Sequence, residues 1–181
     1  MNQTNAPAGE NLLWAPWRLD YIRSVASGNE GCFLCQYAAA PDADSGHLVI
    51  ARSPHALLVM NKFPYVNGHL LVAPYRHAAD LGDLSAEERS SMMELAAHAQ
   101  KLLFGAMNPQ GYNIGINQGR CAGAGLPGHV HMHVVPRWSG DVNFMSVVGQ
   151  VRVIPQALEQ AYSQLHAEHQ RLVSAATQQR A

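Results

Sequence analysis

The feature that most constrains this chain is a run of three histidines at alternate positions, within Gly-His-Val-His-Met-His-Val-Val-Pro at 128–136. Successive side chains of an extended strand point to opposite faces, so His129, His131 and His133 would share one face. The apolar residues between them would seal the other face against a core. A row of buried imidazoles needs polar partners, which makes a purely structural role costly. The spacing predicts a strand with one reactive face, the simpler alternative being an exposed or chance cluster.

Length and composition are those of one globular domain. The chain has 181 residues, of which 48% are hydrophobic and 14% charged, and its formal net charge is -1. It is long enough to bury its own core, and the low charge favours self-association. A polynucleotide-binding surface usually carries a basic patch, so the charge argues against one. No run is long and apolar enough for a membrane span, and the polar N-terminus does not look like a signal peptide. The sequence predicts a cytoplasmic protein with no membrane partner.

The remaining pattern predicts an α+β fold. Apolar or alternating runs bounded by turn residues indicate strands at 47–51, 56–60, 69–74, 112–117 and 147–154. Ser85 and Glu88 have the spacing of a capping box, which begins a helix that should end near Met107. Pro16 and Pro155 would open shorter N- and C-terminal helices, the first of them ending near residue 25. These elements predict an antiparallel sheet of about five strands with the main helix packed on one face.

Two chemistries can use three aligned imidazoles. Three histidines can hold a catalytic zinc, but ligands at every second position are spread along a strand and do not converge easily on one ion. Alternatively, one imidazole attacks phosphorus to give a nucleotidyl-imidazole, while its neighbours carry protons or stabilise phosphoryl oxygens. The glycine-rich loop at 119–128 could supply backbone N–H groups that cradle an anion. The strand geometry favours the covalent chemistry.

The run at 128–136 matches the histidine triad pattern, and the chain resembles the histidine triad (HIT) family. The resemblance extends to 61–74 and to the Asn-Gln-Gly at 117–119, covering about residues 31–140. It implies a HIT-like fold in which 31–140 form the HIT domain. Residues 1–30 would then be an N-terminal extension with a short helix, and 141–181 a C-terminal strand and helix that complete the same domain.

The resemblance implies a nucleotide hydrolase or transferase that acts on an α-phosphate, with unequal roles for the histidines. His131 would be the nucleophile, and His133 would hold phosphoryl oxygens. His129 would orient the strand or assist protonation, and His69 would prop the triad from the neighbouring strand. Asn61 would contact the ribose. Further nucleotide-binding positions are implied at Asn117, Gln118, Gly123, Gly125 and Leu126.

Other blocks narrow the expected substrate. The segments at 12–18 and 135–138 resemble a bacterial branch near the diadenosine polyphosphate phosphorylases and hydrolases, which implies diadenosine tri- or tetraphosphate as substrate. Fragile-histidine-triad hydrolases carry polar residues where Gly125 and Leu126 stand here. A purine nucleoside phosphoramidase and a non-catalytic nucleotide sensor stay open as alternatives, although phosphoramidases tend to carry a serine in the loop before the triad. No organic cofactor is expected, and family members are usually homodimers.

Cys32 and Cys35 form a Cys-x-x-Cys pair. In a reducing compartment this spacing indicates metal or redox chemistry more often than a structural disulfide. A structural zinc site needs four ligands, and His77 and His129 are the best completing pair. Zinc-bearing members of the wider superfamily use such a set, with the first triad histidine as a ligand. The resemblance therefore implies a structural Zn²⁺, whereas the alternative is two small core thiols.

Overall fold

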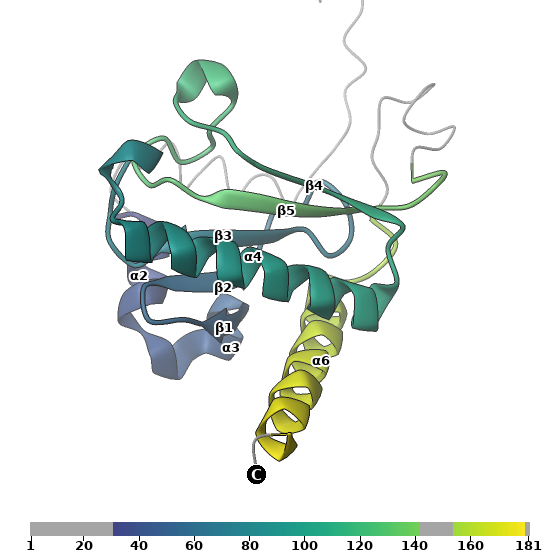
Figure 1. Ribbon diagram of the computed structural model, residues 1–181. Coiled ribbons are helices and arrows are strands. Elements are labelled where there is room, and N and C mark those ends of the chain that lie inside the picture. The colour runs from purple at the N-terminus through teal and green to yellow at the C-terminus, as the bar shows by residue number, and fades with distance from the viewer. Residues whose placement is uncertain (1–30, 142–153, 180–181) are drawn as a thin grey trace, which may run out of the picture. The chain divides into compact units, whose positions relative to one another are not determined.

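The alternating runs form a five-stranded antiparallel sheet in the order β1-β2-β3-β5-β4 (Figure 1). The strands are β1 (Val49–Arg52), β2 (Ala56–Met60), β3 (Leu70–Pro74), β4 (Gly111–Ile116) and β5 (Met132–Arg137). The helices are α2 (Phe33–Ala39), α3 (Asp44–His47), α4 (Ala86–Met107) and α6 (Leu158–Gln178), with short 3-10 turns at Pro41–Ala43, Leu81–Asp83 and Arg120–Ala122. The α+β architecture predicted from the sequence is confirmed.

This computed structural model describes residues 31–141 and 154–179. Apart from Gly31, these residues belong to one compact unit, Cys32–Ala181. The helix expected at 16–25 and nearly all of the strand expected at 147–154 lie outside the described residues. The expected division into 1–30, 31–140 and 141–181 stays a prediction. No helix within the described ranges is long and apolar enough to cross a membrane.

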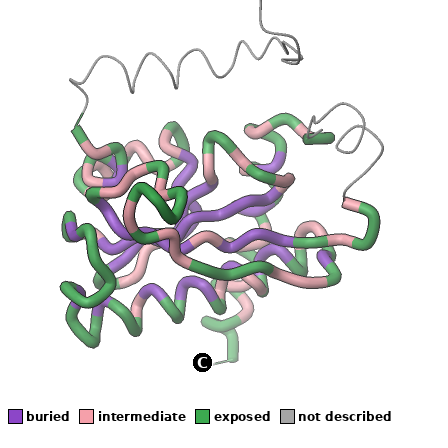
Figure 2. The backbone as a smooth tube through the Cα atoms, turned by 90° about the horizontal axis from the view of Figure 1, so that it is seen from above, coloured by how far each residue is buried: buried purple, intermediate pink, exposed green. Residues whose placement is uncertain are grey.

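The period of two along β2 divides its side chains between two cores. Ala56, Leu58 and Met60 pack in the cluster under α4, whereas Leu57 and Val59 pack in the cluster on the opposite face. None of the five is more than 2% exposed. Figure 2 accordingly shows the central strands as buried. The middle of the sheet is therefore covered on both sides, by α4 and α6 on one and by α2 on the other.

Helix α4 begins at the predicted capping box. Ser85 Oγ accepts a hydrogen bond from the Glu88 N–H at 3.2 Å, and Glu88 Oε2 accepts one from the Ser85 N–H at 2.7 Å. The helix ends at Asn108, whose φ of 48° lies in the left-handed region, so the expected end near Met107 is confirmed. The buried stripe that packs on the sheet includes Met92, Leu95, Ala99, Leu102 and Leu103.

The turn before β3 brings backbone close to α4. Gly68 has a φ of 73°, and a Cβ there would lie 2.8 Å from Met107 Sδ. A Cβ at this position would displace the ends of the Met107 and Leu103 side chains, and the positive φ strains other residues, so both the packing and the backbone angle favour glycine. This turn fixes where β3 begins and hence where the preceding residues 61–67 lie.

Helix α2 was not predicted. It has seven residues, and no side chain caps its N-terminus. So short a helix carries little periodic signal, and its formation depends on tertiary packing. Leu34 and Tyr37 supply that packing in the cluster opposite α4.

We expect the capping-box carboxylate to stabilise the fold in a pH-dependent way. Arg76 and the Ser85 N–H lower the pKa of Glu88 from 4.5 to about 2. Because the folded pKa is depressed, the stabilisation is fully present above the unfolded value and is lost as the pH falls through about 4 toward 2. Urea unfolding of Glu88→Gln should show a lower free energy of unfolding than the wild type at pH 7, and the difference should shrink below about pH 5. The exposed Glu94→Gln is the control on the same helix, and a Glu88 difference that does not vary with pH would contradict the expectation.

Candidate functional site

The register of β5 decides which histidine faces which core. His133 is paired with Leu71 of β3 and Gly115 of β4. Its neighbours Met132 and Val134 belong to the core under α4, whereas Leu71 belongs to the opposite core. His133 therefore projects from the face opposite α4.

Three histidines meet on this face. The ring centroids of His131 and His133 are 5.0 Å apart, and those of His69 and His133 are 5.2 Å apart. The predicted proximity of the fourth histidine is thus present in the structure.

The expectation that all three histidines lie within one strand is wrong, but Val130, Met132 and Val134 all pack in the core under α4, which leaves His129, His131 and His133 on the opposite side. The strand begins only at Met132, so His129 and His131 precede it. Here the backbone follows other bonds, because the Val130 N–H donates to Ala78 O at 2.7 Å. The alternation of faces nevertheless continues back through Val130, and the His129 ring lies on the α2 side of the sheet, 5.1 Å from the ring of His77.

Hydrogen bonds fix the tautomers of His69 and His133. The Tyr65 N–H donates to Nδ1 of His69 at 3.1 Å, so that nitrogen carries no proton. The proton of neutral His69 is therefore on Nε2, which lies 3.0 Å from Nδ1 of His133 and donates to it. His133, neutral in turn, carries its proton on Nε2.

That last N–H is unsatisfied. Nε2 of His133 is buried and has no hydrogen-bond partner within the described part of the chain. A buried polar group without a partner costs about 1–3 kcal/mol. An oxygen of a bound ligand would satisfy it, which makes this atom a candidate contact for a phosphoryl group.

His131 is held in the complementary tautomer. Its Nδ1 lies 2.9 Å from the backbone oxygen of His129, to which only an N–H can donate. The lone pair is therefore on Nε2. Burial lowers the pKa of His131, and burial together with neighbouring histidines lowers the pKa of His69 to about 3 and that of His133 to about 4. Near neutral pH all three are uncharged, and Nε2 of His131 is available as a nucleophile.

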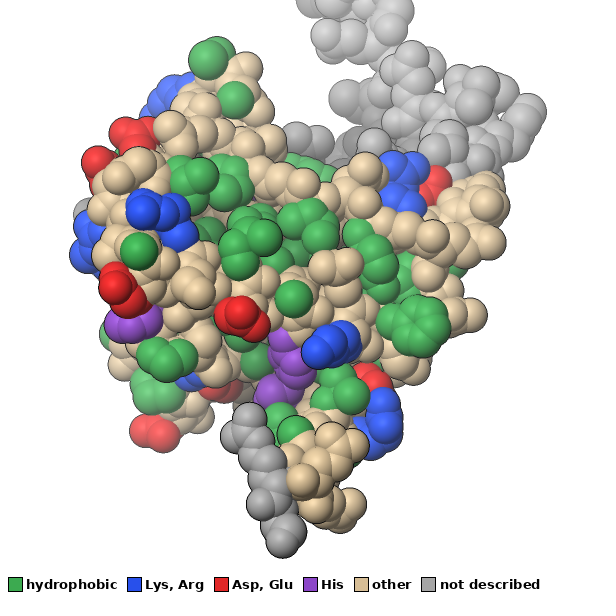
Figure 3. Space-filling model, in the orientation of Figure 1, with side chains coloured by type: hydrophobic (Ala, Val, Ile, Leu, Met, Phe, Trp, Pro, Cys, Tyr) green, Lys and Arg blue, Asp and Glu red, His purple; other side chains and the backbone are tan. Residues whose placement is uncertain are grey.

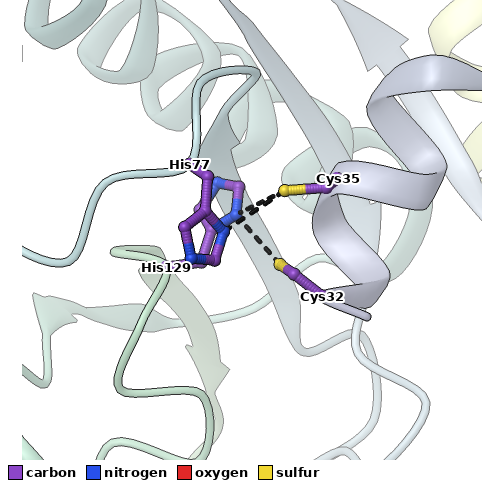
Figure 4. Close-up of side chains that lie close together, drawn as sticks. All are labelled: Cys32, Cys35, His77 and His129. Carbon is purple, nitrogen blue, oxygen red and sulfur yellow. Dashed lines mark hydrogen bonds between the residues drawn. The ribbon is translucent and has the colours of Figure 1, made fainter. Parts of the chain in front are cut away.

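A second cluster lies beside this group (Figure 4). Cys32, Cys35, His77 and His129 each offer one ligand atom, and these atoms all lie within 4.8 Å of one another. Cys32 Sγ is 3.1 Å and Cys35 Sγ 3.5 Å from Nδ1 of His129, and Cys35 Sγ is 3.3 Å from Nδ1 of His77. The structure thus brings together the four residues that the resemblance implied as metal ligands.

The donor set fits a tetrahedral Zn²⁺ site of two thiolates and two imidazoles. Nε2 of His129 donates to Pro74 O at 2.9 Å, which leaves the lone pair of Nδ1 facing the cysteines. Such an outer hydrogen bond is the usual way in which a ligating histidine is oriented. Burial and the neighbouring Cys32 raise the pKa of Cys35 to about 11, so a cation is needed to hold it as a thiolate.

The HIT domain family model matches residues 43–140. This chain belongs to the HIT domain family. A relative from Mycobacterium tuberculosis named AP-4-A phosphorylase is 38% identical over 81% of this chain and 77% of its own length. A Schizosaccharomyces pombe relative named Bis(5'-nucleosyl)-tetraphosphatase [asymmetrical] is 32% identical over 53% of this chain and 52% of its own length. A Zn-bound histidine triad family protein from Mycobacterium smegmatis has a similar structure, with a TM-score of 0.65 and 28% identity over 80% of this chain and 97% of that one. HIT relatives with these enzyme names indicate a nucleotide-processing enzyme.

Two expected nucleotide contacts of this HIT protein have partners within the chain. Asn61 Oδ1 accepts from the Phe63 N–H at 2.9 Å, and Nδ2 of Asn61 lies 3.2 Å from Nδ1 of His69. Gln118 Oε1 accepts from the Leu81 N–H at 3.1 Å. Both side chains therefore help to hold the site, and their contact with a nucleotide stays a prediction.

The loop before the triad leaves backbone accessible. Gly123 and Gly125 are exposed, and Gly123 has a φ of 84°. Asn117 is half-buried at the end of β4, and Leu126 packs partly against the α2-side core. The predicted anion-cradling role of this HIT loop is compatible with that exposure and stays untested.

Sequence reasoning missed Tyr65 and Pro74. Each acts through its backbone, as a donor to His69 and an acceptor from His129, and a backbone role leaves no mark in residue type. A turn-rich loop just before His69 was the only signal, and it does not say which N–H reaches the ring.

Proposed function

We propose that this protein cleaves dinucleoside polyphosphates, such as diadenosine tri- or tetraphosphate, at the α-phosphate through a nucleotidyl-histidine on His131. One observation carries the chemistry. The backbone oxygen of His129 accepts a hydrogen bond from the Nδ1–H of His131, so that the Nε2 lone pair is free beside the unsatisfied Nε2–H of His133. A nucleophile and a donor for the phosphoryl oxygens thus lie on one face.

The reaction has two displacements. Nε2 of His131 forms a bond to the α-phosphorus as the bond to the bridging oxygen breaks, and the remaining polyphosphate leaves with that electron pair. The Nδ1–H of His131 stays bonded to a carbonyl oxygen, which stabilises the positive charge that develops on the ring. Water or phosphate then attacks phosphorus, the P–N bond breaks, and His131 recovers its lone pair. Nε2–H of His133 stabilises the phosphoryl oxygens in both steps.

The names of the relatives support inorganic phosphate, besides water, as a candidate acceptor of the nucleotidyl group. The M. tuberculosis relative is named a phosphorylase, and the S. pombe relative is named a tetraphosphatase. A third relative, named Adenosine 5'-monophosphoramidase hnt1, is 30% identical over 59% of this chain. The loop at 123–128 contains no serine, which disfavours a phosphoramidase reading.

Replacing the nucleophile should abolish turnover. We expect His131→Asn to lower the rate with diadenosine tetraphosphate by roughly a thousandfold or more, because the lone pairs of the two neighbouring histidines, His69 and His133, already accept hydrogen bonds. A wild-type sample quenched in alkali during turnover should carry one nucleotidyl group by mass, and His131→Asn should carry none. His55→Asn, an exposed histidine, is the control. Near-normal activity of His131→Asn would contradict the covalent mechanism.

Product analysis separates the open alternatives. With diadenosine tetraphosphate, attack by water gives AMP and ATP, whereas attack by inorganic phosphate gives ADP and ATP. We expect cleavage in at least one condition, and the phosphate-dependent appearance of ADP identifies a phosphorylase. Binding without either product set would identify a nucleotide sensor and reject the proposed enzyme.

We propose that the Cys32, Cys35, His77 and His129 cluster holds a structural Zn²⁺. The four ligand atoms already converge, and a Zn-bound family member is similar in structure. The ion would tie α2 to the segment that carries His131, and its role would be to fix these elements in place. No step of the reaction needs it.

Metal analysis tests this site. Protein purified without chelator should contain about one zinc per chain, and Cys32→Ser should lower both the zinc content and the melting temperature. Cys121→Ser is the matched control, because Cys121 is exposed on the loop outside the cluster. Wild-type protein without zinc would reject the proposal.

We also propose a homodimer. Met93 and Phe104 of α4 are 59% and 63% exposed, and Ile114 of the edge strand β4 is 41% exposed. Figure 3 shows hydrophobic side chains gathered on the face that α4 covers. Light scattering should give twice the chain mass of 19.7 kDa. Phe104→Glu should give the single-chain mass, and a monomeric wild type would contradict the proposal.

A further inference from the structure

Tyr65 is in contact with the catalytic face, but the two displacements assign it no role. Its ring centroid lies 4.4 Å from that of His69 and 5.6 Å from that of His133. The planes of Tyr65 and His133 differ by only 18°, which is a stacked arrangement. Tyr65 is 43% exposed, while His69 beneath it is fully buried. The tyrosine ring therefore covers the histidine pair from the solvent side.

The backbone of the same residue sets the direction of the proton chain. The Tyr65 N–H and the Asn61 amide both reach Nδ1 of His69, at 3.1 and 3.2 Å. The Asn61 amide is itself oriented, because its oxygen accepts from the Phe63 N–H. Two donors at one nitrogen exclude a proton from it, so His69 must donate to His133 through Nε2.

This bond alone does not fix the His133 ring. A hydrogen bond tolerates some misalignment, so torsion of the ring about its Cα–Cβ and Cβ–Cγ bonds within that tolerance would still turn Nε2 out of its direction. His131 meets the His133 ring edge-on, at an interplanar angle of 60°. Tyr65 adds a flat contact over the ring face, and a flat contact restrains the plane. The hydrogen bond and the stack together leave one orientation for Nε2–H.

We propose that Tyr65 is a positioning residue, whose ring fixes the plane of the His133 imidazole so that its Nε2–H meets a phosphoryl oxygen of the substrate. This inference rests on the proposed function. Tyr65 acts through His133, and its own side chain has no part in either displacement. The aromatic ring is required, and its hydroxyl group is not.

Two variants separate the effect of the aromatic ring from the effect of apolar bulk. Tyr65→Phe keeps the aromatic face, whereas Tyr65→Leu keeps an apolar side chain without it. Aromatic pair contacts of this kind correspond to roughly a three- to tenfold effect. We expect Tyr65→Leu to lower kcat by that factor with KM nearly unchanged, and Tyr65→Phe to stay within about twofold of the wild type.

A readout without substrate tests the positioning itself. ¹⁵N chemical shifts of the imidazole nitrogens, assigned with His133→Asn, should show His133 protonated on Nε2 in the wild type and in Tyr65→Phe. Tyr65→Leu keeps the backbone N–H that sets the tautomer, so its His133 should also be protonated on Nε2, but with exchange-broadened ring resonances because the ring plane is no longer restrained. A wild-type His133 protonated on Nδ1 would overturn the proposal, as would a Tyr65→Leu variant with wild-type kcat and His133 ring resonances as sharp as those of the wild type.

The same design distinguishes the two proposals. If the wild type cleaves no dinucleoside polyphosphate, the proposed function fails, whereas the ¹⁵N spectra still show whether Tyr65 orders His133. If Tyr65→Leu does not fold, the wild-type tautomer and the Tyr65→Phe rate continue to test the inference.

Discussion

The site depends on one residue, His129, through three of its hydrogen-bonding atoms. Its backbone oxygen accepts the Nδ1–H of His131, its Nε2 donates to Pro74 O, and its Nδ1 faces the two cysteines. Because the residue is fully buried, each of these groups needs its partner. The tautomer of His131, the proposed nucleophile, is therefore coupled to the end of β3 and to the position of α2. A local change at any of the three would therefore alter the other two.

A second constraint is the chain of hydrogen bonds that runs from the Tyr65 backbone N–H through His69 to His133. A peptide N–H does not change its protonation state in the range in which histidines titrate, so the tautomer of His69 is set by the fold and not by pH. Because a neutral imidazole has one donor nitrogen and one acceptor nitrogen, the tautomer of His69 determines that of His133. Burial, which lowers the pKa of His69 and of His133, keeps both uncharged and preserves the chain of donors. The turn that ends at Gly68 thus determines which nitrogen of His133 faces a ligand.

Local sequence patterns predicted most of the fold but only part of the candidate site. The strands and α4 follow from period-two runs and a capping box, both of which involve residues close together in the sequence. That β5 begins only at Met132 was not predictable, because the Val130 N–H just before it is bonded to Ala78 O, fifty-two positions earlier. Helix α2 was missed for the same reason, since long-range packing of Leu34 and Tyr37 holds it. The two histidine ligands that complete the metal cluster were implied by the family resemblance, and not by the Cys-x-x-Cys spacing.

One face of the sheet forms the main hydrophobic core, and the other carries the candidate catalytic side chains. Under α4 the strands present a continuous apolar surface, while on the other face the core with α2 draws on β1, β2 and β3 only. Beside His133 on that face stands Gly115 of β4, and a Cβ placed there would meet nothing within 4 Å. Among the described residues the face is therefore open next to the unsatisfied N–H, which is where the proposed substrate would lie. Had α2 extended over β5, the same histidines would have been sealed in the core, and their unsatisfied donor would have been only a cost.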